Sequence, residues 1–294
     1  MSPKDLLSAL IVILVWGVNF VVIKVGLHGV PPMLLGALRF ALVAFPAVFF
    51  VKRPAIAFRW LFAYGATISL GQFALLFYAM SVGMPAGLAS LVLQAQAFAT
   101  LIFAAVILGE RVRVPNILGL LVAACGLAVI GIEGGHAMTA AGFVLTLGAA
   151  CMWGMGNVIT KRMGKVDLLS LVVWASLIPP LPFLALSLML EGPGRIEASL
   201  STISLTSVAA IVYLAFVATM MGYTLWGKLL ARYPASQVAP FSLLVPIVGL
   251  VSAALLLDEG LSPVQMLGAV LVMAGLVVNV FGGQLARRLT SAAR

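Results

Sequence analysis

Charged residues are scarce in this chain. They make up 9% of its 294 residues, while hydrophobic residues make up 63%. A typical soluble domain has roughly 25% charged and 45–50% apolar residues, so the composition excludes a soluble globular protein and a disordered chain. The apolar residues occur in long runs rather than in short alternating strands, which excludes an outer-membrane barrel. The sequence therefore predicts an all-α polytopic membrane protein.

Cysteine and histidine are also nearly absent. The two cysteines, Cys125 and Cys151, lie inside apolar runs, so we expect no disulfide framework and no metal site. The sequence has no phosphate-binding Gly-Lys-Ser/Thr loop, no nucleophile elbow and no pair of acids within an apolar run. We therefore expect no catalytic residues, no cofactor and no enzymatic activity.

Several apolar runs are long enough to cross a bilayer, which takes roughly 20 helical residues. They cover residues 6–24, 33–51, 60–80, 86–108, 115–132, 139–160, 168–190, 203–227, 235–257 and 263–282. The links between these ten runs are short, and the longest spans only residues 191–202. The sequence therefore predicts ten transmembrane helices without a soluble domain between them.

The net charge of +9 reflects 17 basic and 8 acidic residues. All but three of the bases fall on the N-terminal side of the predicted membrane: Lys4, Lys52, Arg53, Arg59, Arg111, Arg113, Lys161, Arg162, Lys165, Lys228, Arg232, Arg287, Arg288 and Arg294. Lys24 and Arg195 fall on the opposite side, and Arg39 lies within the second run. Because cytoplasmic loops retain basic residues, we expect both termini to be cytoplasmic. The positive charge then reflects orientation in a lipid bilayer, and no nucleic-acid partner is needed.

The two halves of the chain repeat each other. Matched residues are Trp16, Gly17, Asn19, Lys24, Pro85, Leu108, Gly119 and Gly126 in the first half and Trp153, Gly154, Asn157, Lys161, Pro234, Leu257, Gly268 and Gly275 in the second. Each half holds five runs, an odd number, so consecutive copies cross the membrane in opposite directions. The sequence therefore predicts two inverted five-helix repeats, at residues 1–137 and 138–294. Such repeats are typical of secondary transporters.

Four separated stretches carry a family resemblance: residues 16–24 (WGVNFVVIK), 84–98 (MPAGLASLVLQAQAF), 170–174 (SLVVW) and 239–246 (APFSLLVP). With these stretches the chain resembles the drug/metabolite transporter superfamily and, within it, the EamA family. The resemblance covers essentially the whole chain. It implies an inner-membrane exporter of amino-acid metabolites such as cysteine and O-acetylserine, which works by alternating access and is driven by the proton gradient.

Other functions remain open at this point. The chain could export other amino acids or amphipathic drugs, or it could be a channel or a non-transporting scaffold. All eight acidic residues lie at the ends of runs or in loops, so no buried carboxylate is available to bind a lipophilic cation. The inverted repeat favours alternating access over a continuous pore. Whether the protein is a monomer or a homodimer is left open.

Arg39 is the one charged side chain well inside a run. Charged groups in a membrane are costly and are functional candidates by default. We therefore predict that Arg39 binds the carboxylate of a substrate. In the alternative interpretation, the guanidinium bonds to a neighbouring helix and has a structural role.

Other polar and aromatic residues within the runs are also candidates for substrate binding: Trp16, Asn19, Gln72, Ser90, Gln94, Trp153, Asn157 and Tyr223. The alternative for Asn19 and Asn157 is hydrogen bonding between helices. Gln94 and Gln96 point in different directions on a regular helix. We expect Gln94 to face the cavity and Gln96 to bond a neighbouring helix, although the reverse remains open. Trp226 is expected at the membrane interface.

Overall fold

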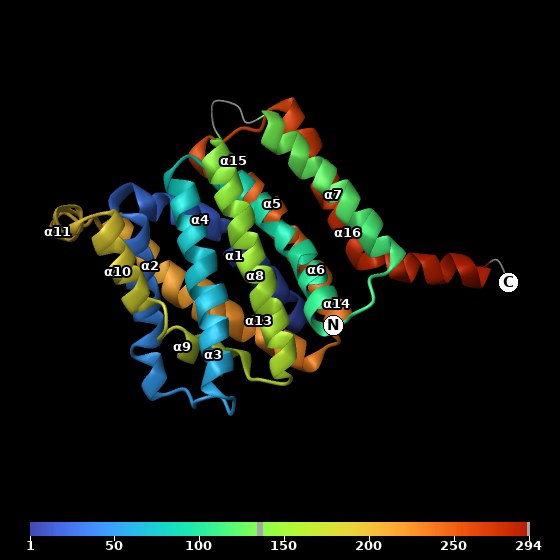
Figure 1. Cartoon of the computed structure of the whole chain (residues 1–294), viewed down its shortest axis with the longest axis horizontal. Helices are drawn as coiled ribbons and strands as arrows, with labels where there is room; N and C mark the ends of the chain where they lie inside the picture. Colours follow the sequence, from blue (N-terminus) through green and yellow to red (C-terminus); the bar gives the residue numbers. More distant parts are fainter. Residues whose placement is uncertain (134–137, 293–294) are drawn as a thin grey trace.

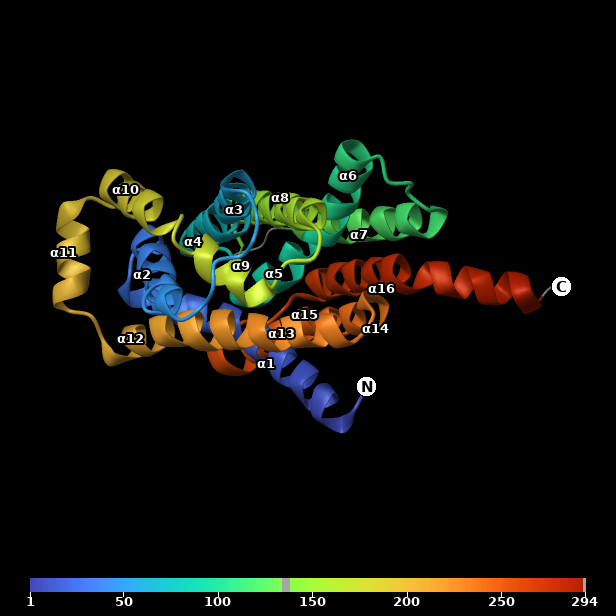
Figure 2. The ribbon, with the colours of Figure 1, turned by 90° about the horizontal axis from the view of Figure 1, so that it is seen from below.

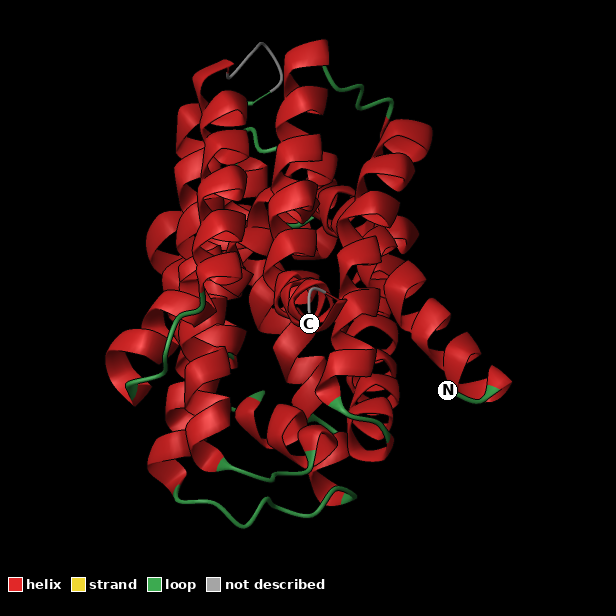
Figure 3. Ribbon diagram, turned by 90° about the vertical axis from the view of Figure 1, so that its right-hand side faces the viewer, coloured by secondary structure: helices red, strands yellow, loops and turns green. Residues whose placement is uncertain are grey.

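Helices form every regular element in the described part of the chain, residues 1–133 and 138–292 of this computed structural model (Figure 3). Ten helical segments in this part are long and apolar enough to cross a membrane. They cover Pro3–Gly29, Pro32–Phe49, Phe58–Ser81, Ala86–Leu108, Val114–Glu133, Ala140–Met163, Leu168–Leu190, Leu205–Arg232, Ala239–Leu257 and Pro263–Gly282. The prediction of ten spans is confirmed. The first and eighth helices extend farther than predicted, because each continues beyond its apolar run into a segment that contains basic residues.

The first half runs from the N-terminus to residue 133. Its α-helices are α1 (Pro3–Gly29), α2 (Pro32–Ala44), α3 (Phe58–Tyr64), α4 (Gln72–Ser81), α5 (Ala86–Val92), α6 (Gln96–Leu108) and α7 (Val114–Glu133). A short 3₁₀ helix, η1 (Ala47–Phe49), ends the second span. Ser2 caps α1 by accepting a hydrogen bond from the Asp5 backbone, and Pro32 occupies the first turn of α2. Both are residue types that favour helix starts.

The second half also holds five spans and contains one additional short helix between two of them. Its α-helices are α8 (Ala140–Met163), α9 (Leu168–Ala175), α10 (Pro180–Leu190), α11 (Pro193–Ser201), α12 (Leu205–Val212), α13 (Gly222–Arg232), α14 (Ala235–Val238), α15 (Val245–Leu257) and α16 (Pro263–Ala292). The predicted link at residues 191–202 contains α11, a short helix that lies between α10 and α12 at the end of the molecule farthest from the C-terminus (Figure 2). Residue 137, the predicted end of the first repeat, lies outside the described residues.

Besides η1, four irregular turns interrupt the spans, and they occupy matching spans of the two halves. The π-helical segments η2 (Gly65–Gly71) and η4 (Tyr213–Met221) interrupt the third and eighth spans. The 3₁₀ segments η3 (Leu93–Ala95) and η5 (Ala239–Leu244) interrupt the fourth and ninth. Such interruptions change which way the following side chains face, and they occur frequently at functional sites.

Glycines bring α7 and α16 together along one side of the bundle (Figure 1). A Cβ atom on Gly126 would lie 2.6 Å from the Gly268 carbonyl oxygen, and one on Gly119 would lie 2.6 Å from that of Gly275. Only glycine permits so close an approach of two backbones. These small residues therefore have a structural role in packing this helix pair.

The repeated Trp-Gly pairs pack each half against the other. A Cβ atom on Gly17 of α1 would lie 2.4 Å from Val248 of α15, and one on Gly154 of α8 would lie 2.7 Å from Ala99 of α6. The first span therefore packs against the ninth, and the sixth span packs against the fourth. The same contact is made twice, with the halves exchanged.

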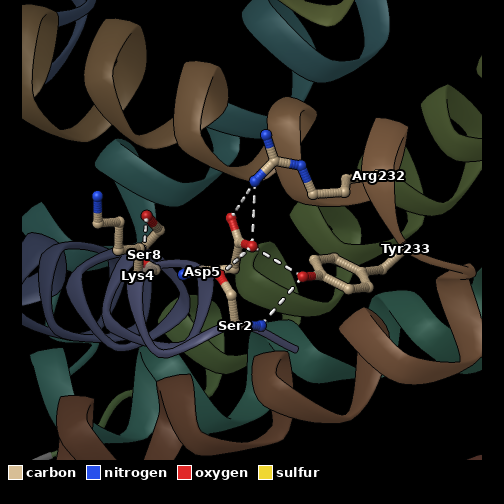
Figure 4. Close-up of polar contacts among 6 residues, drawn as sticks. All are labelled: Ser2, Lys4, Asp5, Ser8, Arg232 and Tyr233. Carbon is tan, nitrogen blue, oxygen red and sulfur yellow. Dashed lines mark hydrogen bonds and ion pairs between the residues drawn. The ribbon is translucent and has the colours of Figure 1, made fainter.

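Polar contacts tie the start of α1 to the end of α13 (Figure 4). Arg232 forms an ion pair with Asp5 at 2.9 Å, and the Tyr233 hydroxyl donates to the same carboxylate at 2.7 Å. The backbone N–H of Ser2 donates to the Tyr233 hydroxyl at 3.1 Å. We call Ser2, Asp5, Arg232 and Tyr233 the terminal cluster. It places the N-terminus at the same end of the bundle as the end of the eighth span, as an even number of crossings requires.

Candidate functional site

A cavity of about 320 Å³ lies between the two halves. Its walls come from both halves, including all four of the irregular turns or the residues next to them. Every predicted site residue except Ser90 lines it: Trp16, Asn19, Arg39, Gln72, Gln94, Trp153, Asn157 and Tyr223. The structure thus brings together residues that are far apart in the sequence, although their role in binding stays a prediction.

Arg39 enters the cavity from α2 with its positive charge almost unpaired. The side chain is 2% exposed, and Nη2 donates to the Thr219 hydroxyl at 2.9 Å. Nε and Nη1 have no hydrogen-bond partner among the described residues. All eight acidic residues are described, and none of them lines the cavity. The guanidinium therefore keeps donors for an oxyanion that the protein does not supply.

Aromatic rings rather than carboxylates surround the Arg39 charge. The guanidinium carbon lies 4.0 Å from the centre of the Phe73 ring and 5.3 Å from that of Phe40. A cation over an aromatic face gains about 0.5–2 kcal/mol, which offsets only part of the cost of burying an unpaired charge. The alternative interpretation of Arg39 holds for one nitrogen, which ties α2 to η4. The other two nitrogens lie unpaired beside the cavity, and carboxylate binding stays a prediction.

Two amide side chains of the cavity also keep unused polar atoms. Asn19 Oδ1 and Gln72 Oε1 are buried and have no hydrogen-bond partner in the protein. Buried polar atoms without partners are rare in folded proteins, and each requires an explanation. Three of the residues that carry such atoms, Asn19, Arg39 and Gln72, line this one cavity. The unpaired atoms include both acceptors and donors, which suits a ligand with groups of both kinds.

Asn157 differs from its repeat partner Asn19, because its amide is engaged between helices. Its Nδ2 donates to Gln96 Oε1 at 2.9 Å and to the Thr100 hydroxyl at 3.0 Å. These bonds join α8 to α6, as the alternative interpretation of Asn157 expected. The expectation that Gln96 bonds a neighbouring helix is likewise confirmed.

The expectation that Gln94 and Gln96 face different ways needs a correction, because both line the cavity. Gln94 lies in the 3₁₀ turn η3, and Gln96 directly follows it. A 3₁₀ helix has about 3.0 residues per turn, so residues two apart diverge by about 120° instead of about 160°. The fourth span therefore contributes both Gln94 and Gln96 to the cavity wall.

Ser90 lies away from the cavity and has partners of its own. Its side chain is fully buried, and its hydroxyl donates to the Gly87 carbonyl oxygen at 2.7 Å. A Cβ atom on Gly249 would lie 2.3 Å from the Ser90 hydroxyl, so α5 and α15 pack tightly here. The prediction that Ser90 lines the cavity together with Gln94 is therefore not supported, because Ser90 lies in α5, before the 3₁₀ turn η3 that holds Gln94.

Aromatic side chains form one wall of the cavity. The ring centre of Trp16 lies 5.4 Å from that of Tyr223 and 5.4 Å from that of Trp226. The Trp16 indole N–H donates to the Ala218 carbonyl at 3.0 Å, and Gly222 leaves room for it. Trp226, which we expected at the membrane interface, also lines the cavity.

Sequence reasoning missed Tyr64 as a candidate and did not connect Thr219 to Arg39. Tyr64 is buried and lines the cavity from the last turn of α3, just before the π-helical η2. Thr219 lies in the π-helical η4, where its hydroxyl accepts from Arg39. Regular helical spacing places Thr219 on the same face as Tyr223 and Trp226, but it does not reveal the contact with Arg39. No sequence motif marks Tyr64 or a π-helical segment.

Comparisons with known proteins agree with this architecture. The EamA-like transporter family matches residues 4–132 and 140–281. A protein of Salmonella typhimurium described as a probable amino-acid metabolite efflux pump is 54% identical, over 98% of both chains. A protein of Escherichia coli with the same description is 53% identical, over 96% of both chains. The similarity to both relatives extends over nearly the whole of each protein.

More distant comparisons extend the same picture. A probable terminal-alkyne amino-acid exporter of Streptantibioticus cattleyicolor is 29% identical, over 94% of this chain and 93% of its own. One solved crystal structure matches with a TM-score of 0.65 and 20% identity, covering 98% of this chain and 99% of the other. At that identity, the structural likeness supports the fold alone.

The ten-span fold and its internal cavity define a multi-pass membrane protein of the transporter class. Within that class, the chain belongs to the EamA-like transporter family. The family predicted from the four sequence stretches is thereby confirmed.

Proposed function

We propose that this protein exports small zwitterionic amino-acid metabolites, such as cysteine and O-acetylserine, across the bacterial inner membrane. The observation that carries the proposal is Arg39, a buried cation with two unused nitrogen atoms beside a cavity lined by no acid. The descriptions of two relatives as probable amino-acid metabolite efflux pumps support the same substrate class.

The carboxylate of the substrate would bind Arg39. A guanidinium presents paired donors that match the two oxygens of a carboxylate. Bonds of this kind to charged groups contribute about 1.5–3 kcal/mol, and burial of the site strengthens them. A substrate carboxylate would neutralise the Arg39 charge, which no acidic residue of the cavity pairs with.

The ammonium group would bind the free amide oxygens of Asn19 and Gln72. An ammonium has three donors and no acceptor, so neutral acceptors suffice when no carboxylate is available. The two amides and Arg39 line one cavity and can therefore hold the opposite ends of one zwitterion. A lipophilic cation finds no counter-charge here, which disfavours it as a substrate.

The cavity size also favours small substrates. Its volume of about 320 Å³ lies near the lower end of the roughly 300–1,000 Å³ range of small-molecule sites. A second candidate function, export of other amino acids, is favoured by the aromatic wall of Trp16, Tyr223 and Trp226, which could accept an apolar side chain. Large amphipathic drugs fit this volume less well.

Transport would proceed by alternating access between two inverted repeats, with both termini cytoplasmic. The exchanged Trp-Gly contacts and the matching irregular turns support such a relation between the halves. In this mechanism, the two halves rock about the Arg39 cavity and open it to one side at a time. A channel would not require this correspondence.

The proton gradient would drive export through carboxylates outside the cavity. Glu110 pairs with Lys161, and its repeat counterpart Glu259 accepts from the Gly87 backbone N–H at 3.0 Å. These carboxylates occupy matching links of the two halves and have different partners. Protonating one of them would weaken its contact and bias the equilibrium between the two openings.

Reconstitution in liposomes tests the proposal. Uptake of labelled O-acetylserine and labelled cysteine would be measured with and without an imposed pH gradient, with protein-free liposomes as the control. We expect saturable flux that the gradient accelerates. No saturable flux of either compound would refute the substrate assignment, and flux that is indifferent to the gradient would refute proton coupling.

A further inference from the structure

The only two bases predicted on the side opposite the termini, Lys24 and Arg195, line one pocket. This pocket, of about 420 Å³, is also lined by His28. It lies where the end of α1 meets α11, and the Ser199 hydroxyl joins these helices by donating to the Gly29 carbonyl at 2.8 Å. Basic residues are depleted on this side of membrane proteins, so their convergence in one pocket is unexpected from topology alone.

The positive charges of this pocket are not neutralised by the protein. Lys24 Nζ donates only to the Met80 carbonyl oxygen, at 3.2 Å, and neither it nor Arg195 forms an ion pair within the described residues. No acidic residue lines the pocket. The nearby Glu191 is buried and already accepts hydrogen bonds from the Met33 and Leu34 backbone.

The pocket continues the line of the central cavity by one helical turn. Phe20 of α1 and Leu76 of α4 line the central cavity, and Lys24 and Met80, four residues farther along the same helices, line the pocket. Four helical residues rise about 6 Å. Ile23 and Phe77, which occupy intervening positions on these two helices, have fully buried side chains.

We propose that Lys24, His28 and Arg195 form a second oxyanion site, which takes the carboxylate of the exported compound after it leaves Arg39. The identity of the carboxylate rests on the function proposed above, whereas the oxyanion site itself does not. Two basic side chains attract a carboxylate or a phosphate without competition from an acid. A cationic site one turn beyond Phe20 and Leu76 of the cavity wall would lower the cost of moving the carboxylate away from Arg39.

Chemical modification of Lys24 tests the oxyanion site. The purified full-length protein, in a phosphate-free detergent, would react with an amine-acetylating reagent, and mass spectrometry would quantify Lys24 against exposed Lys165 in the same molecule. Acetate or inorganic phosphate should slow Lys24 modification at least twofold relative to chloride at equal ionic strength. Equal rates in all three salts would overturn the proposal.

A variant shows whether the anion binds at Lys24 and Arg195 or only screens charge throughout the protein. Arg195→Gln should abolish the protection of Lys24, whereas the matched variant Arg53→Gln, at the opposite end of the bundle, should retain it. Arg195 is exposed on α11, so its replacement leaves the core packing unchanged. Protection that persists in Arg195→Gln would overturn the assignment of this residue.

Lipid discs separate the two sources of the oxyanion. If acetate still protects Lys24 in discs of phosphatidylglycerol, a soluble carboxylate reaches the site, as proposed. If Lys24 is already protected there and acetate adds nothing, a lipid phosphate fills the site and the carboxylate assignment fails. Protection by acetate without any flux in liposomes would refute the export function alone, and flux without protection would refute this site alone.

Discussion

Two arginines show how differently the central cavity and the terminal cluster use positive charge. Arg232 is 67% exposed at its side chain and pairs with Asp5, while Arg39 is 2% exposed and has no acidic partner. An exposed ion pair contributes little to stability, whereas an unpaired buried charge is costly. The costly charge lies beside the cavity, where we propose that a ligand neutralises it. The terminal cluster joins α1 to the end of α13 through an exposed ion pair, which has a small desolvation cost.

The largest effect should follow from removing the cavity charge. Arg39→Gln should lower kcat/KM for O-acetylserine export by about 10- to 100-fold, because hydrogen bonds to a charged group contribute about 1.5–3 kcal/mol. Initial rates in liposomes at equal protein would measure this loss. Membrane levels should stay normal, because the variant breaks no ion pair. A drop in protein level that accounts for the lost flux would instead support the structural interpretation of Arg39.

A smaller effect should follow from keeping the charge and changing its shape. Arg39→Lys should lower kcat/KM by about tenfold, because an ammonium is a point charge and does not offer the planar paired donors of a guanidinium. The same liposome rates would measure it. Activity equal to that of the unchanged protein would show that charge alone matters, and activity as low as that of Arg39→Gln would show that the paired geometry is essential.

The two repeat-related asparagines should separate binding from packing. Asn19→Ala should lower flux severalfold at unchanged thermal stability, because its amide oxygen is unused by the protein. Asn157→Ala should lower stability by about 0.6–2 kcal/mol, because it removes hydrogen bonds between membrane helices. Thermal unfolding in detergent and liposome flux, measured on both variants, check the pair. Equal losses of stability in the two variants would show that Asn19 and Asn157 have the same structural role.

The smallest effect should come from the terminal cluster. Arg232→Gln should change the initial rate of export by less than about twofold, since exposed ion pairs are weak and are screened by salt. It also removes one positive charge, as Arg39→Gln does, and so serves as its matched control. A loss as large as that of Arg39→Gln would mean that charge anywhere in the bundle, rather than in the cavity, determines flux.

The sequence predicted the number of spans because each span needs its own apolar run. It also indicated Arg39 as a candidate site residue, because a single charge inside an apolar run is conspicuous. It failed where helices are irregular. Gln94 and Gln96 share the cavity because of a 3₁₀ turn, and Tyr64 enters it beside a π-helical segment. Such turns depend on packing between spans, which a local pattern does not encode.

Contacts between distant segments were equally hidden from the sequence. Lys24 and Arg195 appeared only as two exceptions to the distribution of bases, and their common pocket depends on how α11 folds against the end of α1. On a regular helix, Ser90 would lie one turn before Gln94 on the same face, which made it a candidate for the cavity. In the structure, Ser90 instead packs closely against Gly249 of α15.

The central claim is that Arg39 binds the carboxylate of the exported compound, and the most direct test compares two substrates in two proteins. Liposome flux of O-acetylserine and of its carboxamide would be measured for the unchanged protein and for Arg39→Gln. The account predicts that the unchanged protein prefers the acid by about tenfold or more and that Arg39→Gln loses this preference. An Arg39→Gln variant that keeps the full preference for the acid would contradict the account.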